Sequence, residues 1–588
     1  MITRIIGLNW KYLIRNFRRY RFPDQLSIFL LDRSYRFNEV IKKSQVDSQN
    51  FQQFGTFYSI SEMDLGIQNE NTHDINERLG FGCFHSDDIV VLKFFAYSLF
   101  KKVLDHKNQM NFILENKICK LDRDISFGQA RWGPNDETII FIGWKEFPYR
   151  LGVWACRNRR SALYAINLES KDIECLTPDD NICVRSPRFS PNLDSFIYLE
   201  NSGGGPHFKG AKLRKYDWKT KKNSTVVDLV ENASGDEFPG IYVDYLPARC
   251  WSEDGKYVYF STIWRSREAI VCIDVENRQL QKVHTDEQFG SCDVLDVQYN
   301  MIVAEFSAPN IEPCLVIGQI DAKNRATIGW KYLDSNAPVI HSDIKWDIKR
   351  LIPTVPNKKY PDLDYEIIVI SPTKMQEKYP LIIMPHGGPH SCFPAEFLSR
   401  RIGFVKLGYI LCIVNYRGSI GFGEANVNHF LEILELKMLL MFSKLLYIAH
   451  MCGQYPDFYK AAVLLNPVID VSNMMGIADI PDWNWVEGGF GDNFDLSTIV
   501  KPDHLKAMWE KSPISHIDKV RAPTLLLLGK KDLRVPMSQG LKYYQLLKAR
   551  KVPVRVYQYD DNHQLLKTKH DGDHFIQAAL WFYKYSSP

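Results

Sequence analysis

An aromatic residue, a turn and an apolar strand recur three times in the first half of the chain. Trp132, Phe189 and Trp251 each precede a turn that contains Pro, Asn, Asp or Gly. The strands expected after these turns cover residues 138–142, 196–199 and 257–260. Copies roughly sixty residues apart are typical of a β-propeller, in which each four-stranded blade packs against the next. Three unrelated hairpins in a β-sandwich are the alternative.

The segment before the first copy carries no legible repeat, and residues 1–120 cannot be assigned to elements from the sequence. A closed ring needs at least four blades, so any further blades must come from this segment in degenerate form. We therefore predict an N-terminal propeller region over residues 1–350, incomplete in its recognisable copies.

Charge and cysteine usage exclude several classes of partner. The chain has 588 residues, so several domains are expected, and its formal net charge is only +4, which argues against nucleic acid as a partner. The 12 cysteines form no C-x-x-C pair. This spacing suits reduced thiols in the cytoplasm, and we expect no metal or other cofactor. Charged residues interrupt the most apolar stretch, 433–448, so no membrane span is expected.

The predicted secondary-structure pattern changes near residue 350, where apolar strands begin to alternate with helical segments. The expected buried parallel strands cover residues 380–385, 409–414, 461–465, 524–528 and 554–559. An amphipathic stretch at 538–551 fits a crossover helix. This pattern predicts an α/β domain over residues 351–588, with a boundary in the proline-rich stretch 351–365.

Three strand ends carry residues suited to acyl transfer. His386-Gly387-Gly388-Pro389 follows the first strand, and paired glycines let backbone N–H groups approach a substrate oxygen. Asp532 and His563 each follow a later buried strand. The glycine loop, and the order and position of this acid and base, are those found in α/β-hydrolases, so Asp532 and His563 are candidate catalytic residues. His570 and His574 lie too far into the next segment to be preferred.

The nucleophile of such a triad has no match. No G-x-S-x-G occurs in the chain, and Gly418-Ser419 fails because Arg417 stands where the first glycine is required. The strained turn beneath a nucleophilic serine needs those glycines. The expected triad is therefore incomplete in this chain.

The chain resembles the acylaminoacyl peptidases of the prolyl oligopeptidase clan. The resembling segments are 158–164, 386–390, 415–423, 453–456, 466–469, 479–483, 511–514 and 546–555. The resemblance implies a propeller on an α/β-hydrolase, cytosolic and homo-oligomeric, that releases an N-acylated amino acid from short blocked peptides. It implies Asp532 as acid, His563 as base, Gly387 and Gly388 in the oxyanion-binding loop, and Arg534 as a substrate contact.

The resemblance also indicates where the missing nucleophile should lie. The serine-bearing elbow should lie shortly before Gly453, where the nucleophile position falls on Phe442, and residues 431–450 look deleted or replaced. Two interpretations stay open. In one, the gene encodes a peptidase whose elbow is lost through splicing or a gene-model error. In the other, the protein is an inactive pseudoenzyme that binds peptides or a protein partner. A lipid or ester hydrolase is a third, weaker reading.

Overall fold

A computed structural model describes two short segments and most of the chain after residue 124. The described residues are 84–86, 89–91, 125–134, 137–145, 151–333, 338–352, 363–374, 378–428, 444–492, 494–495, 497 and 499–586. β1 (Phe84–Ser86) and β2 (Ile89–Val91) pair as an antiparallel hairpin within a compact unit of residues 1–121 and 566–569. The other described residues belong to a second compact unit, which holds every feature discussed below.

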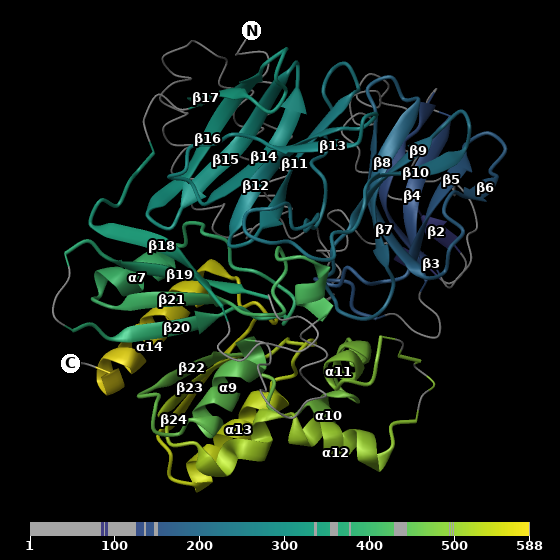
Figure 1. Ribbon diagram of the computed structural model, residues 1–588. Helices are drawn as coiled ribbons and strands as arrows, with labels where there is room; N and C mark the ends of the chain where they lie inside the picture. The colour runs from purple at the N-terminus through teal and green to yellow at the C-terminus, as the bar shows by residue number, and fades with distance from the viewer. Residues whose placement is uncertain are drawn as a thin grey trace, which may run out of the picture. The chain divides into compact units, whose positions relative to one another are not determined.

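The first part of this second unit, called the repeat region here, consists of antiparallel sheets drawn in blue to teal in Figure 1. Its first two sheets have four strands each. They contain β3 (Ile125–Trp132), β4 (Thr138–Lys145), β5 (Ser161–Asn167) and β6 (Ile173–Cys175), then β7 (Ile182–Phe189), β8 (Ser195–Ser202), β9 (Lys212–Asp217) and β10 (Lys222–Val227). Strands pair in chain order, and the last strand of each sheet is the most exposed. This is the arrangement of propeller blades.

The remaining strands of the repeat region join into one seven-stranded sheet. They are β11 (Tyr257–Trp264), β12 (Arg267–Asp274), β13 (Gln279–Lys282), β14 (Ser291–Gln298), β15 (Met301–Ala308), β16 (Ile311–Ile320) and β17 (Ile328–Tyr332). A single parallel pair between β12 and β14 links the hairpins on its two sides. Two successive blades therefore lie edge to edge at this point.

The three sequence repeats fold in the same way. Trp132 pairs with Ile139, Phe189 with Phe196 and Trp251 with Val258. Each turn is closed by an equivalent backbone hydrogen bond, whose donors Gly133, Ser190 and Ser252 lie 2.8, 2.9 and 2.8 Å from their acceptor oxygens. The propeller assignment is confirmed in these copies, and the blades expected before residue 120 lie outside the described residues apart from the β1–β2 hairpin.

The second part, called the α/β region, contains two sheets rather than one. The first has the order β18-β19-β21-β20 and the second the order β22-β23-β24. Their bounds are β18 (Ile344–Leu351), β19 (Tyr365–Pro372), β20 (Leu381–Pro385), β21 (Ile410–Asn415), β22 (Ala462–Leu465), β23 (Thr524–Gly529) and β24 (Val554–Tyr559). The five strands expected from apolar runs are all present, and pair in parallel within each sheet.

Helices accompany these strands, as expected for an α/β-hydrolase. They are α7 (Ser399–Lys406), α9 (Lys444–Gln454), α10 (Val471–Met474), α11 (Pro481–Glu487), α12 (Pro502–Glu510), the 3₁₀ helix η2 (Pro513–Lys519), α13 (Ser538–Ala549) and α14 (Thr568–Ser586). α13 approaches β23 closely, because a Cβ on Gly540 would lie 2.5 Å from the Leu528 side chain. Every residue of β23 is buried, as in a strand covered on both faces.

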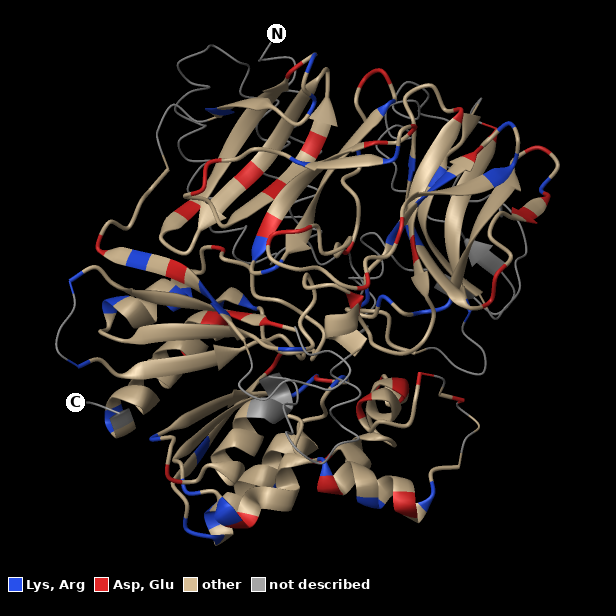
Figure 2. Cartoon of the chain, in the orientation of Figure 1, with Lys and Arg blue, Asp and Glu red and all other residues tan. Residues whose placement is uncertain are grey.

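Two observations complete the fold. β18 precedes the proline-rich stretch expected to separate the domains, yet it pairs along its whole length with β19. Its residues therefore contribute to the sheet of the α/β region. Among the residues described, no helix is both long and apolar enough to cross a lipid bilayer. Figure 2 shows acidic and basic residues interspersed along both regions rather than gathered into one basic stripe.

Candidate active site

The candidate acid and base come from two neighbouring parallel strands. The ends of β23 and β24 are in register, with Gly529 opposite Tyr559. Backbone hydrogen bonds continue this pairing into the loops, from Lys530 N–H to the Tyr559 oxygen at 2.9 Å and from Lys531 N–H to the Asp561 oxygen at 2.9 Å. The two loops therefore start side by side. This brings together Asp532, three residues after β23, and His563, four residues after β24.

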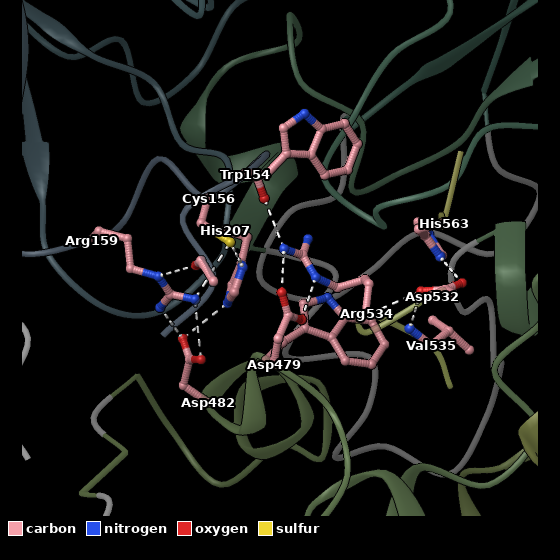
Figure 3. A network of polar contacts seen from close by, with 12 residues as sticks. Trp154, Cys156, Arg159, His207, Asp479, Asp482, Asp532, Arg534, Val535 and His563 are labelled. Atoms are coloured by element: carbon pink, nitrogen blue, oxygen red, sulfur yellow. Dashed lines mark hydrogen bonds and ion pairs between the residues drawn. The ribbon is translucent and has the colours of Figure 1, made fainter. Parts of the chain in front are cut away.

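The side chains of Asp532 and His563 contact each other in these loops. His563 Nδ1 lies 2.6 Å from Asp532 Oδ2 (Figure 3). Asp532 Oδ1 accepts backbone N–H bonds from Arg534 at 2.9 Å and Val535 at 2.8 Å. The Asp532 side chain is fully buried, whereas the His563 side chain keeps 19% of its surface exposed. The carboxylate is thus contacted by three nitrogen groups, and the imidazole is partly exposed.

Asn466 fixes the backbone beneath the histidine. Its side-chain Nδ2 donates to the His563 carbonyl oxygen at 2.6 Å, and its Oδ1 accepts from Gly529 N–H at 2.7 Å. Asn466 follows β22 and has a positive φ of 42°. One amide therefore ties the ends of three strands together. Sequence reasoning missed this role, although an Asn directly after a buried strand is a residue type that tolerates the left-handed conformation.

The glycine pair lies directly after β20 in a constrained loop. Gly388 has a φ of +135°, and a Cβ there would lie 2.7 Å from the backbone nitrogen of His390. Its carbonyl oxygen accepts from Trp483 Nε1 at 3.1 Å, and the Gly387 oxygen accepts from His386 Nδ1 at 2.8 Å. Within the described part of the chain, no acceptor is hydrogen bonded to either glycine N–H. Neither N–H is therefore engaged by the described residues around it.

Arg534 is engaged with protein groups. Its Nε and Nη2 donate to the two carboxylate oxygens of Asp479 at 2.8 and 3.2 Å, and Nη2 also donates to the Trp154 carbonyl oxygen at 3.0 Å. Burial alone would lower the pKa of this guanidinium, but the charges of Cys156 and Asp479 raise it above its ordinary value. The predicted substrate contact stays a prediction, and it would have to share the guanidinium with Asp479.

Comparison with known proteins places the chain in a family. The model of the acylamino-acid-releasing enzyme N-terminal domain matches residues 114–346, and that of the prolyl oligopeptidase family matches residues 446–587. The mouse acylamino-acid-releasing enzyme is 37% identical over 511 residues, which cover 82% of this chain and 69% of the mouse protein. The Arabidopsis thaliana enzyme is 31% identical, over 80% and 69% of the two chains. The chain belongs to the acylamino-acid-releasing enzyme family.

Solved structures support the same fold. A puromycin-hydrolyzing peptidase from Mycobacterium tuberculosis superposes with a TM-score of 0.56 at 13% identity, over 80% of this chain and 71% of its own. A second structure, of a puromycin hydrolase, gives a TM-score of 0.54 at 14% identity over 80% of each chain. At this identity the likeness concerns the fold, a β-propeller followed by an α/β-hydrolase, as the sequence predicts.

The position expected for the nucleophile lies outside the described residues, because Phe442 and Ser443 belong to the segment 429–443. Among the residues that are described, no hydroxyl is hydrogen bonded to Nε2 of His563. Ser419 is engaged elsewhere: its hydroxyl is buried, lies 2.6 Å from His386 Nε2 and donates to the Tyr416 oxygen at 2.5 Å.

A cavity separates the two sheets of the α/β region. Its volume is about 660 Å³, and residues 381–385 of β20 and 462–465 of β22 both line it, with apolar side chains such as Phe404 and Met451. β20 pairs only with β21, and β22 only with β23, among the strands that the structure describes. Among the described residues, each of these two parallel strands thus has one edge without a strand partner, whereas buried parallel sheets are normally continuous.

Sequence reasoning set His570 aside, and the structure assigns it a partner other than Asp532. His570 Nδ1 lies 2.9 Å from Asp561 Oδ2, and both side chains are buried. Asp561 Oδ1 also accepts from the N–H of Asn562, the residue before His563. This second acid–histidine pair therefore holds the loop that carries the candidate base, and no local sequence signal distinguishes it from a catalytic pair.

Proposed function

We propose that this chain carries the acid and base of an acylaminoacyl-peptidase active site and lacks the serine nucleophile of that site. One observation supports the proposal above all: the 2.6 Å contact between Asp532 and His563 at the ends of adjacent parallel strands. In a complete site, His563 Nε2 takes the proton of the serine hydroxyl and returns it to the leaving amine. Asp532 keeps the proton on Nδ1 and stabilises the imidazolium.

The glycine loop supplies the second element of the proposed chemistry. The negative oxygen that forms during acyl transfer needs N–H donors already aimed at it. The unengaged N–H groups of Gly387 and Gly388, in a loop whose shape only glycine tolerates at 388, are suited to this task. Arg534, two residues after Asp532, would contact a carbonyl or carboxylate of the substrate next to Asp479.

The proposed substrates are short N-acylated peptides, released as an N-acylated amino acid and a shortened peptide. The family supports the peptide class, since the relatives are acylamino-acid-releasing enzymes. We further propose a cytosolic homo-oligomer, with neither nucleic acid nor a membrane as a partner. The near-neutral charge and the scattered cysteines support the location and the absence of a nucleic-acid role.

A peptide-binding pseudoenzyme is the second candidate, and the absence of any G-x-S-x-G in the chain favours it. The edges of β20 and β22, which pair with no other strand among the described residues, point the same way, since a strand that leads to a nucleophile elbow would lie between them. Such a protein would retain the acid, the base and the glycine loop while binding acylated peptides without cleaving them.

Kinetics on the purified chain test the proposal. We expect turnover of acetyl-alanine p-nitroanilide about 10⁶-fold below that of a full triad, and no fluorophosphonate labelling. Binding of an acetylated tripeptide, followed by calorimetry, should persist in His563→Ala. Turnover at the rate of a complete enzyme, or fluorophosphonate labelling of a serine, would contradict the missing nucleophile. If neither turnover nor peptide binding is seen, the proposed substrate class is wrong.

Sequencing the transcript across codons 424 to 453 separates the two candidates. An alternative transcript that restores G-x-S-x-G would identify a peptidase gene, and the protein made from it should regain turnover that His563→Ala and Asp532→Asn abolish or strongly reduce. An uninterrupted transcript of the present length would favour the pseudoenzyme.

A further inference from the structure

A second cluster of reactive groups lies beside the candidate active site and takes no part in it. Cys156 Sγ lies 3.0 Å from His207 Nδ1, and His207 Nε2 lies 3.1 Å from Asp482 Oδ2. Cys156 and His207 come from loops of the repeat region, whereas Asp482 is on α11. Figure 3 shows these side chains on one side of Arg534 and the Asp532–His563 pair on the other. The order thiol, imidazole and carboxylate is that of an activated cysteine.

A buried cation completes the cluster. Arg159 Nη1 donates to Asp482 Oδ2 at 2.6 Å, and Arg159 Nη2 lies 3.4 Å from Cys156 Sγ. The side chains of Arg159 and Asp482 are 11% and 12% exposed, and that of His207 is 9% exposed. Two positive groups therefore face one thiol in a poorly solvated site, which favours the thiolate.

The titration behaviour agrees with this geometry. Burial would raise the pKa of the Cys156 thiol, but the charges of His207 and Arg159 outweigh it and lower the pKa to about 7. Burial would lower the pKa of His207, whereas Cys156 and Asp482 raise it to about 9. Between these values the thiolate and the imidazolium coexist as an ion pair.

The cluster lies beneath a partly exposed loop. Cys156 keeps 5% of its surface exposed, and the preceding Val153 and Trp154 are 42% and 51% exposed. A small, uncharged oxidant is therefore the reagent best suited to a thiol with this little exposed surface.

We propose that Cys156 is a peroxide-reactive thiolate, held by His207, Asp482 and Arg159, and a site of oxidation by peroxide outside the acyl-transfer machinery. The thiolate attacks one oxygen of hydrogen peroxide, the S–O bond forms and the O–O bond breaks. The hydroxide that leaves takes the proton of the His207 imidazolium to give water. Cys156 is oxidised to sulfenic acid and the peroxide is reduced.

Cys272 offers an internal control in the same chain. It is 4% exposed, close to the 5% of Cys156, but it lies in an apolar cluster, where burial raises the pKa of its thiol to about 11. The two cysteines therefore have a similar exposed fraction. They differ in the expected fraction of thiolate, since a thiol with this pKa is almost entirely protonated near neutral pH.

The experiment treats the whole purified chain with hydrogen peroxide from pH 5.5 to 9.5. The reaction is stopped with catalase, the protein is denatured in dimedone or iodoacetamide, and both cysteine peptides are quantified by mass spectrometry. We expect Cys156 to be oxidised at least about 100-fold faster than Cys272 at pH 7.5, with a rate whose midpoint lies near pH 7 and which levels off above about pH 8. Equal rates, or a rate that rises only above about pH 8.5, would overturn the proposal.

Variants test the role of the neighbours. His207→Asn keeps a donor near the sulfur without the positive charge, and should slow oxidation of Cys156 about tenfold or more and move its pH inflection upward. Glu169→Gln, at an exposed position of the repeat region, should change neither. An unchanged Cys156 rate in a folded His207→Asn protein would overturn the assignment. If that variant fails to fold, the pH profiles of the unmodified chain decide the matter alone.

Discussion

The sheets of the repeat region and of the α/β region are assembled in different ways. In the repeat region each strand of the first two sheets pairs with its neighbour along the chain, from β3 to β6 and from β7 to β10. In the α/β region the parallel neighbours are separated in the chain by helices, as β22 is from β23, and the facing edges of the two sheets, β20 and β22, lie on either side of one cavity. A blade is complete within its own segment, whereas a parallel sheet depends on every central strand.

The first test concerns the ion pairs that join the repeat region to the α/β region. Arg265, in the turn between β11 and β12, donates to Glu366 at 2.6 Å and to Asp364 at 2.7 Å, and all three side chains are buried. Arg265→Ala would leave the buried Glu366 without its cation, while Asp364 keeps Arg350, so we expect the free energy of unfolding to fall by about 3–5 kcal/mol. Urea denaturation followed by fluorescence measures this loss.

The matched control is Arg325→Ala within the repeat region. Arg325 pairs with Asp254, whose side chain is 35% exposed, so the expected loss is at most about 1 kcal/mol. Equal losses in the two variants would mean that the contact between the regions contributes no more than an ordinary surface ion pair.

A second contact between the regions is expected to depend on pH. Glu424 Oε2 accepts the N–H of Gly210 at 2.9 Å, and burial raises the pKa of this carboxyl to about 7 from its ordinary 4.5. In that pH range the folded protein therefore holds a proton that the unfolded chain has lost. The stability that this proton contributes is complete below pH 4.5 and is lost as the pH rises through 7, about 3 kcal/mol in all.

Glu424→Gln removes the titration and keeps an oxygen for Gly210. The difference in unfolding free energy between the variant and the unchanged chain, measured in urea from pH 4.5 to 8, should therefore grow in favour of the variant as the pH rises. Glu169→Gln, an exposed side chain, should give a difference that does not vary with pH. A flat difference for both variants would show that Glu424 is ionised throughout.

Enlarging one alanine in each region should show the difference in packing between the two regions more directly. Ala165 on β5 lies in a packed cluster of the repeat region, so Ala165→Leu should cost about 1–3 kcal/mol. Ala461, directly before β22, lines the 660 Å³ cavity and is only partly buried, so Ala461→Leu should be neutral or stabilising by up to about 1 kcal/mol. Thermal unfolding of the two variants compares them. A loss at Ala461 as large as that at Ala165 would mean that the cavity wall is already close-packed.

The same contrast explains what could be predicted from the sequence. The three repeats and the apolar strands are local patterns, and Asp532 and His563 could be paired because ends of adjacent parallel strands share one edge. Asn466 and the Cys156–His207–Asp482 cluster could not be found, because each joins segments far apart in the chain. The division of the sheet depends on non-local pairing, which the apolar runs of β20 and β22 do not encode.

The smallest expected effect concerns the loop after β20. Gly388→Ala places a Cβ 2.7 Å from the His390 nitrogen at a φ of +135°, so we expect a loss of about 1–2 kcal/mol. Gly476→Ala, in the same region, meets no atom within 4 Å and should change stability by less than about 0.5 kcal/mol. Urea denaturation at one pH compares them. A rigid loop is what an oxyanion site requires, since its N–H groups must be aimed before the charge forms. If both alanines are tolerated equally, the loop adapts to the new side chain, and the oxyanion role proposed for Gly387 and Gly388 loses its structural basis.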